Sequence, residues 1–287
     1  MGSSEFYPEE QPVHRATVDG FWMDEHPVTV AEFRRFVKAT GHRTTAEIAP
    51  RADEFPEADI EQLVPGSLVF RPTSGPVPLN DYTRWWAWTP GADWRHPEGP
   101  GSSVDGRDRH PVTHVSFFDA QAYAAWSGKA LPTEAEWEFA ARGGLEDARF
   151  AWGDDELIHH RPQANTWQGE FPWQNLLDDG FGGTSPIGSF PANGYGLLDV
   201  TGNTWEWTTG RWAPGHTISC CAPAKVAAPG EPYPRRVVKG GSHLCAPNYC
   251  LRYRPAARQG QTEDTSTAHL GFRCVVRPAP GSGSTSA

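Results

Sequence analysis

The chain has 287 residues, with 35 acidic and 25 basic side chains, a formal net charge of −10 and a pI near 5.5. This acidic balance argues against a nucleic-acid partner, which requires a concentrated basic face. No apolar run reaches the roughly 18 residues that a membrane-spanning helix needs, so we expect no membrane segment. Thirty glycines and 27 prolines predict many turns, and 13 tryptophans indicate a loop-rich globular chain that is not disordered.

Three helices are predicted from capping motifs, in which Ser or Thr precedes an acidic residue by three positions. They run over residues 29–41, 116–128 and 133–143, and a glycine ends each one. The side chains expected to face the core are Val30, Phe33, Phe36, Val37, Ala120, Tyr123, Ala124, Trp126, Trp137 and Ala140 or Ala141.

Short strands are expected at residues 14–23, 236–239 and 271–276, which are rich in β-branched and aromatic side chains. Residues 42–110 and 144–235 show no sustained periodicity and are expected to form long ordered loops, which are often functional. No change in composition marks a linker. The sequence therefore predicts one α+β domain with few regular elements.

The two ends of the sequence and its cysteine content bear on the cellular compartment. The first residues are neither basic nor apolar, so they do not predict a signal peptide. Together with an odd number of cysteines, five, this favours a reducing compartment, and we expect a cytoplasmic protein that is a monomer. Residues 281–287 are expected to form a flexible tail.

Two cysteines, Cys245 and Cys250, lie five positions apart near the end of the chain. Their spacing matches neither the C-x2-C pair of zinc sites nor that of redox proteins. Two thiolates without another soft ligand suit Cu(I), but a disulfide or two ordinary buried cysteines are equally consistent with the spacing. Nearby arginines (Arg252, Arg254 and Arg258) would favour the thiolate form. The adjacent pair Cys220–Cys221 is interpreted as incidental.

Two polar loops offer hard oxygen ligands. One contains Asn165, Asp178 and Asp179, and the other contains Asp199 and Glu206 among glycines and asparagines. Carboxylate and carbonyl oxygens of this kind can surround Ca²⁺. Neither loop has the EF-hand spacing, so helix caps and Asx-turns remain the alternative interpretation.

Taken together, several segments resemble one known family along almost the whole chain. These segments are residues 26–37, 128–144, 164–169, 193–207, 240–254 and 271–274. The chain resembles the formylglycine-generating enzymes, or sulfatase-modifying factors, of the prokaryotic aerobic type. The resemblance implies a compact α+β fold, low in regular structure and related to C-type lectins. It also implies one domain over residues 1–280 that lacks the first strand of the family.

The resemblance further implies a reaction. Members of this family use O2 to convert the cysteine of a Cys-x-Pro-x-Arg segment in an unfolded sulfatase to Cα-formylglycine. Carried over to this chain, Cys245 and Cys250 would hold Cu(I), and the substrate cysteine would join as a third sulfur ligand. An external thiol would supply the balancing electrons. Ser242 and Trp205 match residues beside the copper, whereas Tyr249 and Arg254 match residues of the substrate pocket.

The resemblance also implies two structural calcium ions. The first would be held by the side chains of Asn165 and Asp179 and the carbonyls of Thr166 and Phe181. The second would be held by the side chains of Asp199 and Glu206 and the carbonyls of Gly202 and Thr204. The tryptophan-rich run 85–94 also matches the family and would line the peptide groove or belong to the core. The positions that form disulfides in secreted members read Ala124, Ala141 and Pro255, so Cys274 is expected to be unpaired.

Two rival functions remain. The first is a non-catalytic calcium- or ligand-binding module on the same lectin-like scaffold. The second is a non-haem iron sulfoxide synthase, which requires a set of iron-binding histidines that the sequence does not show. The cysteine pair discriminates between these possibilities, because a binding module has no need of it.

Overall fold

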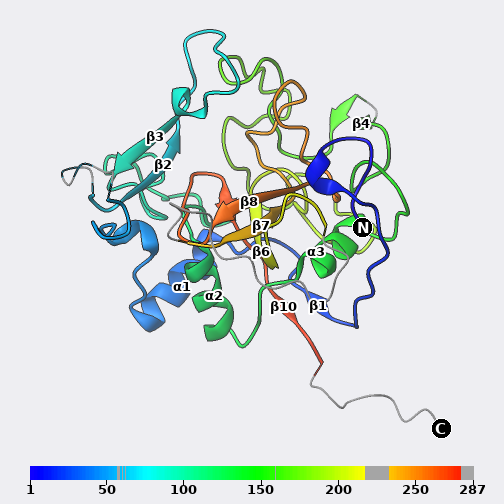
Figure 1. The fold of residues 1–287 in the computed structure, drawn as a ribbon, viewed down its shortest axis with the longest axis horizontal. Coiled ribbons are helices and arrows are strands. Elements are labelled where there is room, and N and C mark those ends of the chain that lie inside the picture. Colours follow the sequence, from blue (N-terminus) through cyan, green and yellow to red (C-terminus); the bar gives the residue numbers. More distant parts are fainter. Residues whose placement is uncertain (57–58, 60, 62, 159, 217–232, 279–287) are drawn as a thin grey trace.

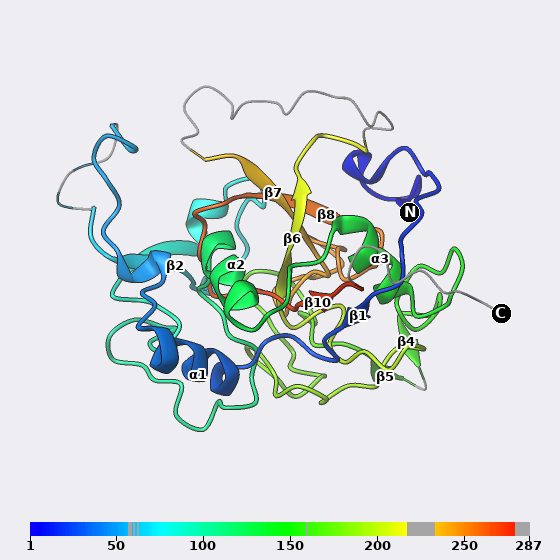
Figure 2. The same ribbon diagram turned by 90° about the horizontal axis from the view of Figure 1, so that it is seen from below.

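The computed structural model describes residues 1–56, 59, 61, 63–158, 160–216 and 233–278. The expected tail at 281–287 and the pair Cys220–Cys221 lie outside these residues. Small sheets and short helices are joined by long ordered loops (Figures 1 and 2). This mixed α+β architecture in one compact domain confirms the predicted fold class. None of the described helices has the length and apolar character needed to cross a membrane.

The three predicted helices are confirmed as α1 (Val30–Thr40), α2 (Phe117–Trp126) and α3 (Glu134–Arg142). In each, the N-cap hydroxyl and an acidic side chain three residues later form the expected capping box. Helices α1 and α2 lie side by side (Figures 1 and 2). The expectation for Trp126 was wrong, because this side chain is 44% exposed at the end of α2.

A four-stranded sheet at the centre of the molecule has the order β8-β7-β6-β9 (Figure 1). Its strands are β6 (Trp205–Arg211), β7 (Arg235–Lys239), β8 (Arg258–Thr262) and β9 (Leu270–Gly271). Strand β6 pairs antiparallel with β7 and parallel with β9. Only β7 was predicted in place, and β6 falls in a segment expected to be a loop. The central strand of the site was therefore missed.

Three two-stranded sheets surround the central one. They are β1 (Trp22–Met23) with β10 (Val275–Val276), β2 (Gly66–Phe70) with β3 (Trp86–Pro90), and β4 (Leu157–Ile158) with β5 (Arg161–Pro162). The hairpins β2–β3 and β4–β5 lie at opposite ends of the molecule (Figures 1 and 2). Short 3-10 helices occur at η1 (Pro8–Glu10), η2 (Thr45–Glu47) and η4 (Tyr82–Arg84).

Two strand predictions require correction. Within residues 14–23 only Trp22 and Met23 form a strand, because only these two residues find a partner, in β10. The predicted strand at 271–276 is divided into β9 and the later strand β10, since its two halves pair with different neighbours.

The main hydrophobic core lies between α1, α2 and the central sheet. It contains aromatic side chains from α1, α2 and β6 and also includes Cys245, Cys250 and Tyr253. The cysteine pair is thus built into the core, where its surroundings are fixed by packing.

Candidate active site

The loop that follows β7 positions the cysteine pair. It starts at Gly240 and Gly241, whose φ angles of 94° and 70° are in the left-handed region that favours glycine. A Cβ atom on Gly241 would lie 2.8 Å from the backbone nitrogen of Tyr253. The double glycine therefore lets the two ends of the loop, residues 240–254, pack backbone against backbone.

Cys245 and Cys250 face each other inside this loop. Their Sγ atoms are 2.8 Å apart, well beyond the ~2.05 Å of a disulfide bond, and both residues are free thiols. The side chains are almost completely buried, at 1% and 6% exposure. The loop is held in place by the backbone N–H of Trp167, which donates to the carbonyl of Cys245 at 3.0 Å. The predicted proximity of the two sulfurs is thus present in a buried, reduced pair.

The two thiols have different electrostatic surroundings. A hydrogen bond from Cys245 and the guanidinium of Arg252, 4.0 Å from Sγ, hold the pKa of Cys250 below its usual range. Burial, followed by its neighbour Cys250, raises the pKa of Cys245 well above its usual range. Of the two thiols, Cys250 therefore loses its proton more readily than Cys245.

Arg252 is positioned by the N-terminal segment, residues 1–10. Its guanidinium forms a 2.7 Å ion pair with Glu9 and lies 3.8 Å from the ring centroid of Tyr7. The Tyr7 hydroxyl accepts a hydrogen bond from the backbone N–H of Leu251. Sequence reasoning missed this segment, although its acidic and aromatic side chains complement the arginines of the cysteine loop.

The other two arginines near the pair act as anchors. The guanidinium of Arg254 binds both carboxylate oxygens of Glu10 and donates to the carbonyl of Leu251. Arg258 binds Glu134 at the start of α3 through two hydrogen bonds of 2.7 and 3.0 Å. Of the three arginines expected beside the thiols, Arg252 is the one that contacts a sulfur. Arg254, predicted to be a pocket residue, is only 1% exposed.

The remaining predicted catalytic residues surround the pair in different ways. Ser242 is fully buried, and its hydroxyl accepts a 3.2 Å hydrogen bond from the backbone N–H of Leu244. Trp205 is 2% exposed at the start of β6 and belongs to the same core cluster as both cysteines. Tyr249 is half-buried, and burial followed by the neighbouring Cys250 raises its pKa to about 12.

Buried aromatic side chains pack around Tyr249. The ring of Phe171 stacks on that of Tyr249 with centroids 4.5 Å apart, and the ring of Trp85 meets it edge-on at 5.4 Å. The tryptophan-rich run 85–94 is divided in its roles. Trp85 and Trp94 are buried in the core, whereas Trp88 is 42% exposed.

The first predicted calcium set is brought together by the loop after β5. The backbone N–H groups of Thr166 and Phe181 donate to the two oxygens of Asp179, at 3.1 and 2.9 Å. Burial raises the pKa of Asp179, so a nearby cation would stabilise its charged form. The Oδ1 atom of Asn165 is buried and has no hydrogen-bond partner. An orphaned buried oxygen on Asn165 and a desolvated carboxylate held by the next residue, Thr166, fit a hard cation such as Ca²⁺.

The second predicted calcium set does not fit in the same way. A carboxylate has about four lone-pair positions. Those of Glu206 receive three hydrogen bonds from Arg273 and one of 2.7 Å from the indole of Trp137. Glu206 and Arg273 are both completely buried. In this arrangement, the second set lacks one of its two side-chain ligands, and the carboxylate of Glu206 serves as an internal ion-pair partner.

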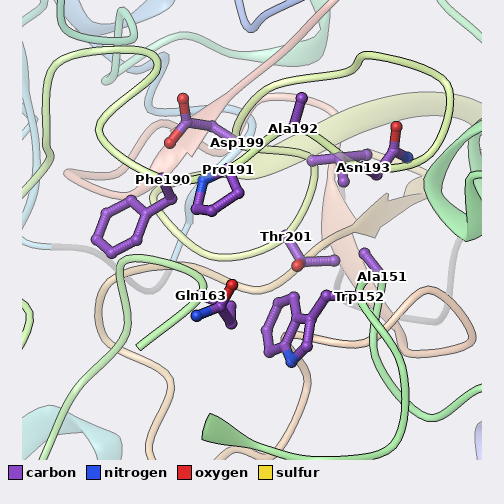
Figure 3. Close-up of a pocket in the computed structure, with 10 residues that line it drawn as sticks. Ala151, Trp152, Gln163, Phe190, Pro191, Ala192, Asn193, Asp199 and Thr201 are labelled. Atoms are coloured by element: carbon purple, nitrogen blue, oxygen red, sulfur yellow. The ribbon is translucent and has the colours of Figure 1, made fainter. Parts of the chain in front are cut away.

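Asp199, the other side chain of this set, lines a small hollow of about 30 Å³ (Figure 3). Gln163, Asn193 and Thr201 contribute further polar groups to its walls. The Oδ2 atom of Asp199 accepts a 2.8 Å hydrogen bond from the backbone N–H of Gly188, and burial raises the pKa of the carboxyl. The hollow has room for a water molecule or a single ion.

Within the described residues, no group of three or more His, Cys, Asp or Glu side chains is arranged to hold a metal ion. A metal ion at the cysteine pair would therefore have two sulfur ligands from the described residues. Two buried soft donors suit Cu(I), which accepts thiolate ligands at low coordination number.

A buried thiol pair in a loop that starts with two glycines, on a lectin-like α+β scaffold, is the combination expected of a sulfatase-modifying factor. The family model described as "Sulfatase-modifying factor enzyme 1-like domain" matches residues 1–278. The chain therefore belongs to the sulfatase-modifying factor family, which confirms the resemblance seen in the sequence.

Proteins named formylglycine-generating enzyme are similar over nearly the whole chain. The protein from Mycobacterium tuberculosis is 54% identical over 98% of this chain and 95% of its own length. The protein from Thermomonospora curvata is 46% identical over 95% of this chain and 88% of its own. Both relatives are named as enzymes, which confirms the expectation of an enzyme. A Bos taurus relative named "Inactive C-alpha-formylglycine-generating enzyme 2" is 39% identical over 93% of this chain.

The solved structures show the same fold at lower sequence similarity. PvdO from Pseudomonas aeruginosa superposes with a TM-score of 0.62 over 96% of this chain and 89% of its own, at 23% identity. Treponema denticola variable protein 1 does so with a TM-score of 0.56 at 18% identity. Likeness at this level establishes the fold and not the activity.

Proposed function

We propose that this protein oxidises the cysteine of a Cys-x-Pro-x-Arg segment in an unfolded sulfatase to Cα-formylglycine. The observation that carries this proposal is the pair of buried, free thiols at 2.8 Å, in a chain 54% identical to a formylglycine-generating enzyme. A ligand-binding module on this scaffold does not need such a pair.

The overall reaction balances with O2 and an external thiol. The substrate side chain loses its sulfur as hydrogen sulfide and gains an aldehyde oxygen. O2 takes two electrons from the substrate and two from two molecules of the external thiol, which form one disulfide. It is reduced to two waters, and one water is consumed in the hydrolysis that supplies the aldehyde oxygen. Cu(I), held by Cys245 and Cys250, would supply the reactivity toward O2 and the electron-rich centre that the substrate sulfur joins.

The residues of the chain prepare the site for this chemistry. Arg252 stabilises negative charge on Cys250, and the core around both sulfurs excludes water. The loop backbone is fixed by the hydrogen bond from the N–H of Cys245 to the carbonyl of Ser242 at 2.9 Å. The half-buried ring of Tyr249, supported by stacking on Phe171, would offer an apolar surface beside the pair for the proline of the substrate segment.

For calcium, we propose one structural ion at the first predicted set. Asn165 and Asp179 would supply side-chain oxygens, and Thr166 and Phe181 would supply carbonyls. The amide of Gln168 now donates to the Thr166 carbonyl and, at 2.9 Å, to Asp179 Oδ2. A bound cation would replace this amide as the positive partner of the two oxygens.

We propose that the protein is a cytoplasmic monomer, as expected from the sequence.

Mass spectrometry of a Cys-x-Pro-x-Arg peptide incubated with the copper-loaded protein, a thiol and O2 tests the function. Loss of the cysteine sulfur with gain of an aldehyde supports the proposal. An unchanged peptide together with retained ligand binding would instead favour a non-catalytic member of the family, the class to which the "inactive" Bos taurus relative belongs by name.

A further inference from the structure

We propose that a cavity between α1 and the loop after β3, residues 91–105, binds a small molecule that carries a phosphate group. This cavity, called here the α1 cavity, measures about 520 Å³, a volume typical of sites for small molecules. Helix α1 lies at the edge of the fold (Figure 2). None of the lining residues belongs to the cysteine loop or to either predicted calcium set, so this site is separate from the site of the proposed oxidation.

Positive charge enters the α1 cavity from both of its walls. Helix α1 contributes Arg34 and Lys38, which are four positions apart and therefore lie on one face of the helix. The loop contributes Arg95 and His96, whereas Asp105 is the one acidic side chain of the lining. Three fixed positive charges thus face one negative charge, in a chain whose net charge is −10. This local reversal of sign favours an anionic ligand.

The two arginines are held by acids that do not line the cavity. The Nη1 atom of Arg34 binds Asp108 at 2.6 Å, and that of Arg95 binds Glu47 at 2.8 Å. The guanidinium of Arg95 also lies 4.2 Å from the centroid of the Trp94 ring. A guanidinium has five N–H donors, and these ion pairs occupy one donor of each arginine. Both arginines are therefore positioned while most of their donors remain for a ligand.

Lys38 supplies a charge that no acid offsets. Within the described residues its ammonium forms no ion pair and no hydrogen bond, although it lies in the last turn of α1, on the wall of the cavity. An ammonium has three donors and a compact charge, which suits a phosphate oxygen. We therefore expect Lys38 to contribute most to the attraction of an anion.

Asp93 fixes the loop wall of the cavity. Its Oδ1 atom accepts hydrogen bonds from the backbone N–H groups of Arg95 and His96, at 2.7 and 2.8 Å. The Nδ1 atom of His96 is 3.2 Å from the same oxygen, so Nε2 is the ring nitrogen left for a ligand. The buried side chains of Val37 and Val104 also line the cavity. The site is thus already formed, and a ligand need not order the loop in order to bind.

The combination of donors favours a phosphate over a carboxylate. A phosphate monoester carries close to two negative charges at pH 7 and has three acceptor oxygens, enough for Lys38 and two arginine forks. A carboxylate offers one charge and two oxygens. The cavity is larger than a phosphate group alone, so we expect a ligand with a small neutral body, such as a sugar phosphate. The hydroxyl of Ser103 and the two valines would contact this body.

Calorimetric titration with ribose 5-phosphate tests the proposal, at a salt concentration of about 0.15 M that screens distant charges. We expect one molecule to bind per chain with a Kd of about 1 mM or tighter, and ribose without phosphate not to bind. Arg34→Gln and Lys38→Gln should each weaken binding by about tenfold, the effect of one charge-assisted hydrogen bond. Asp105→Asn should strengthen binding by about two-fold to five-fold, because it removes the one negative charge of the lining.

Arg35→Gln is the matched control. Arg35 follows Arg34 on α1 and carries the same charge, but it does not line the cavity and has only a 3.9 Å ion pair with Glu32. This variant should bind ribose 5-phosphate as the unmodified protein does. Equal weakening in Arg34→Gln and Arg35→Gln would overturn the site, because it would show attraction to the net charge alone. Equal binding of ribose, or no saturable binding of ribose 5-phosphate, would also overturn it.

Discussion

The guanidinium of Arg254 and the carboxylate of Glu10 form a buried two-point ion pair, with N–O distances of 3.0 and 2.5 Å, across 244 positions of sequence. The exposed fractions of the two side chains are 1% and 0%. This pair attaches the N-terminal segment to the end of the loop that holds both thiols. It gives Arg254 a structural role in shaping the site.

Replacing Glu10 with glutamine should lower the free energy of unfolding by about 3–5 kcal/mol, because the charge of Arg254 would stay buried without its partner. Urea unfolding measures this directly. Asp108→Asn, which removes one partner of the exposed ion pair with Arg34, is the control and should cost at most about 1 kcal/mol. Equal losses in the two variants would contradict the anchoring role of Glu10.

Cys245→Ser and Cys250→Ser should each abolish peptide oxidation while leaving the thermal unfolding temperature close to that of the unmodified protein. Both sulfurs belong to one donor set, so losing either one removes the site. Cys274→Ala is the control, because Cys274 is a buried free thiol directly before β10 and outside the cysteine loop. It should retain activity. Full activity in either serine variant would rule out a two-sulfur site.

Calcium binding should depend on Asp179 and not on the carboxylate of Glu206. Asp179→Asn should weaken Ca²⁺ affinity by about tenfold or more, since it removes the one charged ligand of the first set. Glu206→Gln should leave that affinity unchanged but lower stability by about 3–5 kcal/mol, because Arg273 would lose its buried partner. Calorimetric titration of the chelator-treated protein measures the affinities. A loss of affinity in Glu206→Gln would show that its carboxylate reaches a calcium ion.

Stability should fall as the pH is lowered from about 6.5 toward 4. Burial lowers the pKa of His114 and of His243 to about 4, and that of His269 to about 3. Below pH 6.5 these histidines bind protons in the unfolded chain but stay neutral in the folded one, so the free energy of unfolding falls. Above pH 6.5 they are neutral in both states and do not change the free energy of unfolding with pH. Each histidine adds up to about 1.4 kcal/mol of lost stability per pH unit.

Urea unfolding at pH 7, 6 and 5 measures this slope. His114→Asn preserves a polar partner for Ser67, which His114 now contacts at 2.8 Å, and should reduce the slope by one group's share. A stability profile that is flat between pH 7 and 5 would show that these imidazoles are accessible to protons.

Helix positions could be predicted from the sequence because their signals are local. Thr29 and Glu32 lie three residues apart and form the capping box that starts α1. Strand β6 could not be predicted in this way, because its first four residues, Trp205 to Thr208, are all buried and show no alternation. Residues 271–276 look like one strand, but two different partners divide them.

The candidate site, like the fold, was predicted only where its signals are local in sequence. The proximity of Cys245 and Cys250 follows from their spacing and the resemblance to a known family. The roles of Glu9 and Glu10 depend on contacts across more than 240 positions, which no local pattern encodes. The buried ion pair between Glu206 and Arg273 likewise can be recognised only when β6 is placed in the central sheet.

The most direct measurement is mass spectrometry of a Cys-x-Pro-x-Arg peptide after incubation with copper-loaded protein, an external thiol and O2, with Cys250→Ser in parallel. We predict that the cysteine sulfur is replaced by an aldehyde oxygen only with the unmodified protein. A peptide that keeps its sulfur with both proteins, although the unmodified one binds one equivalent of Cu(I), would contradict the proposed oxidation.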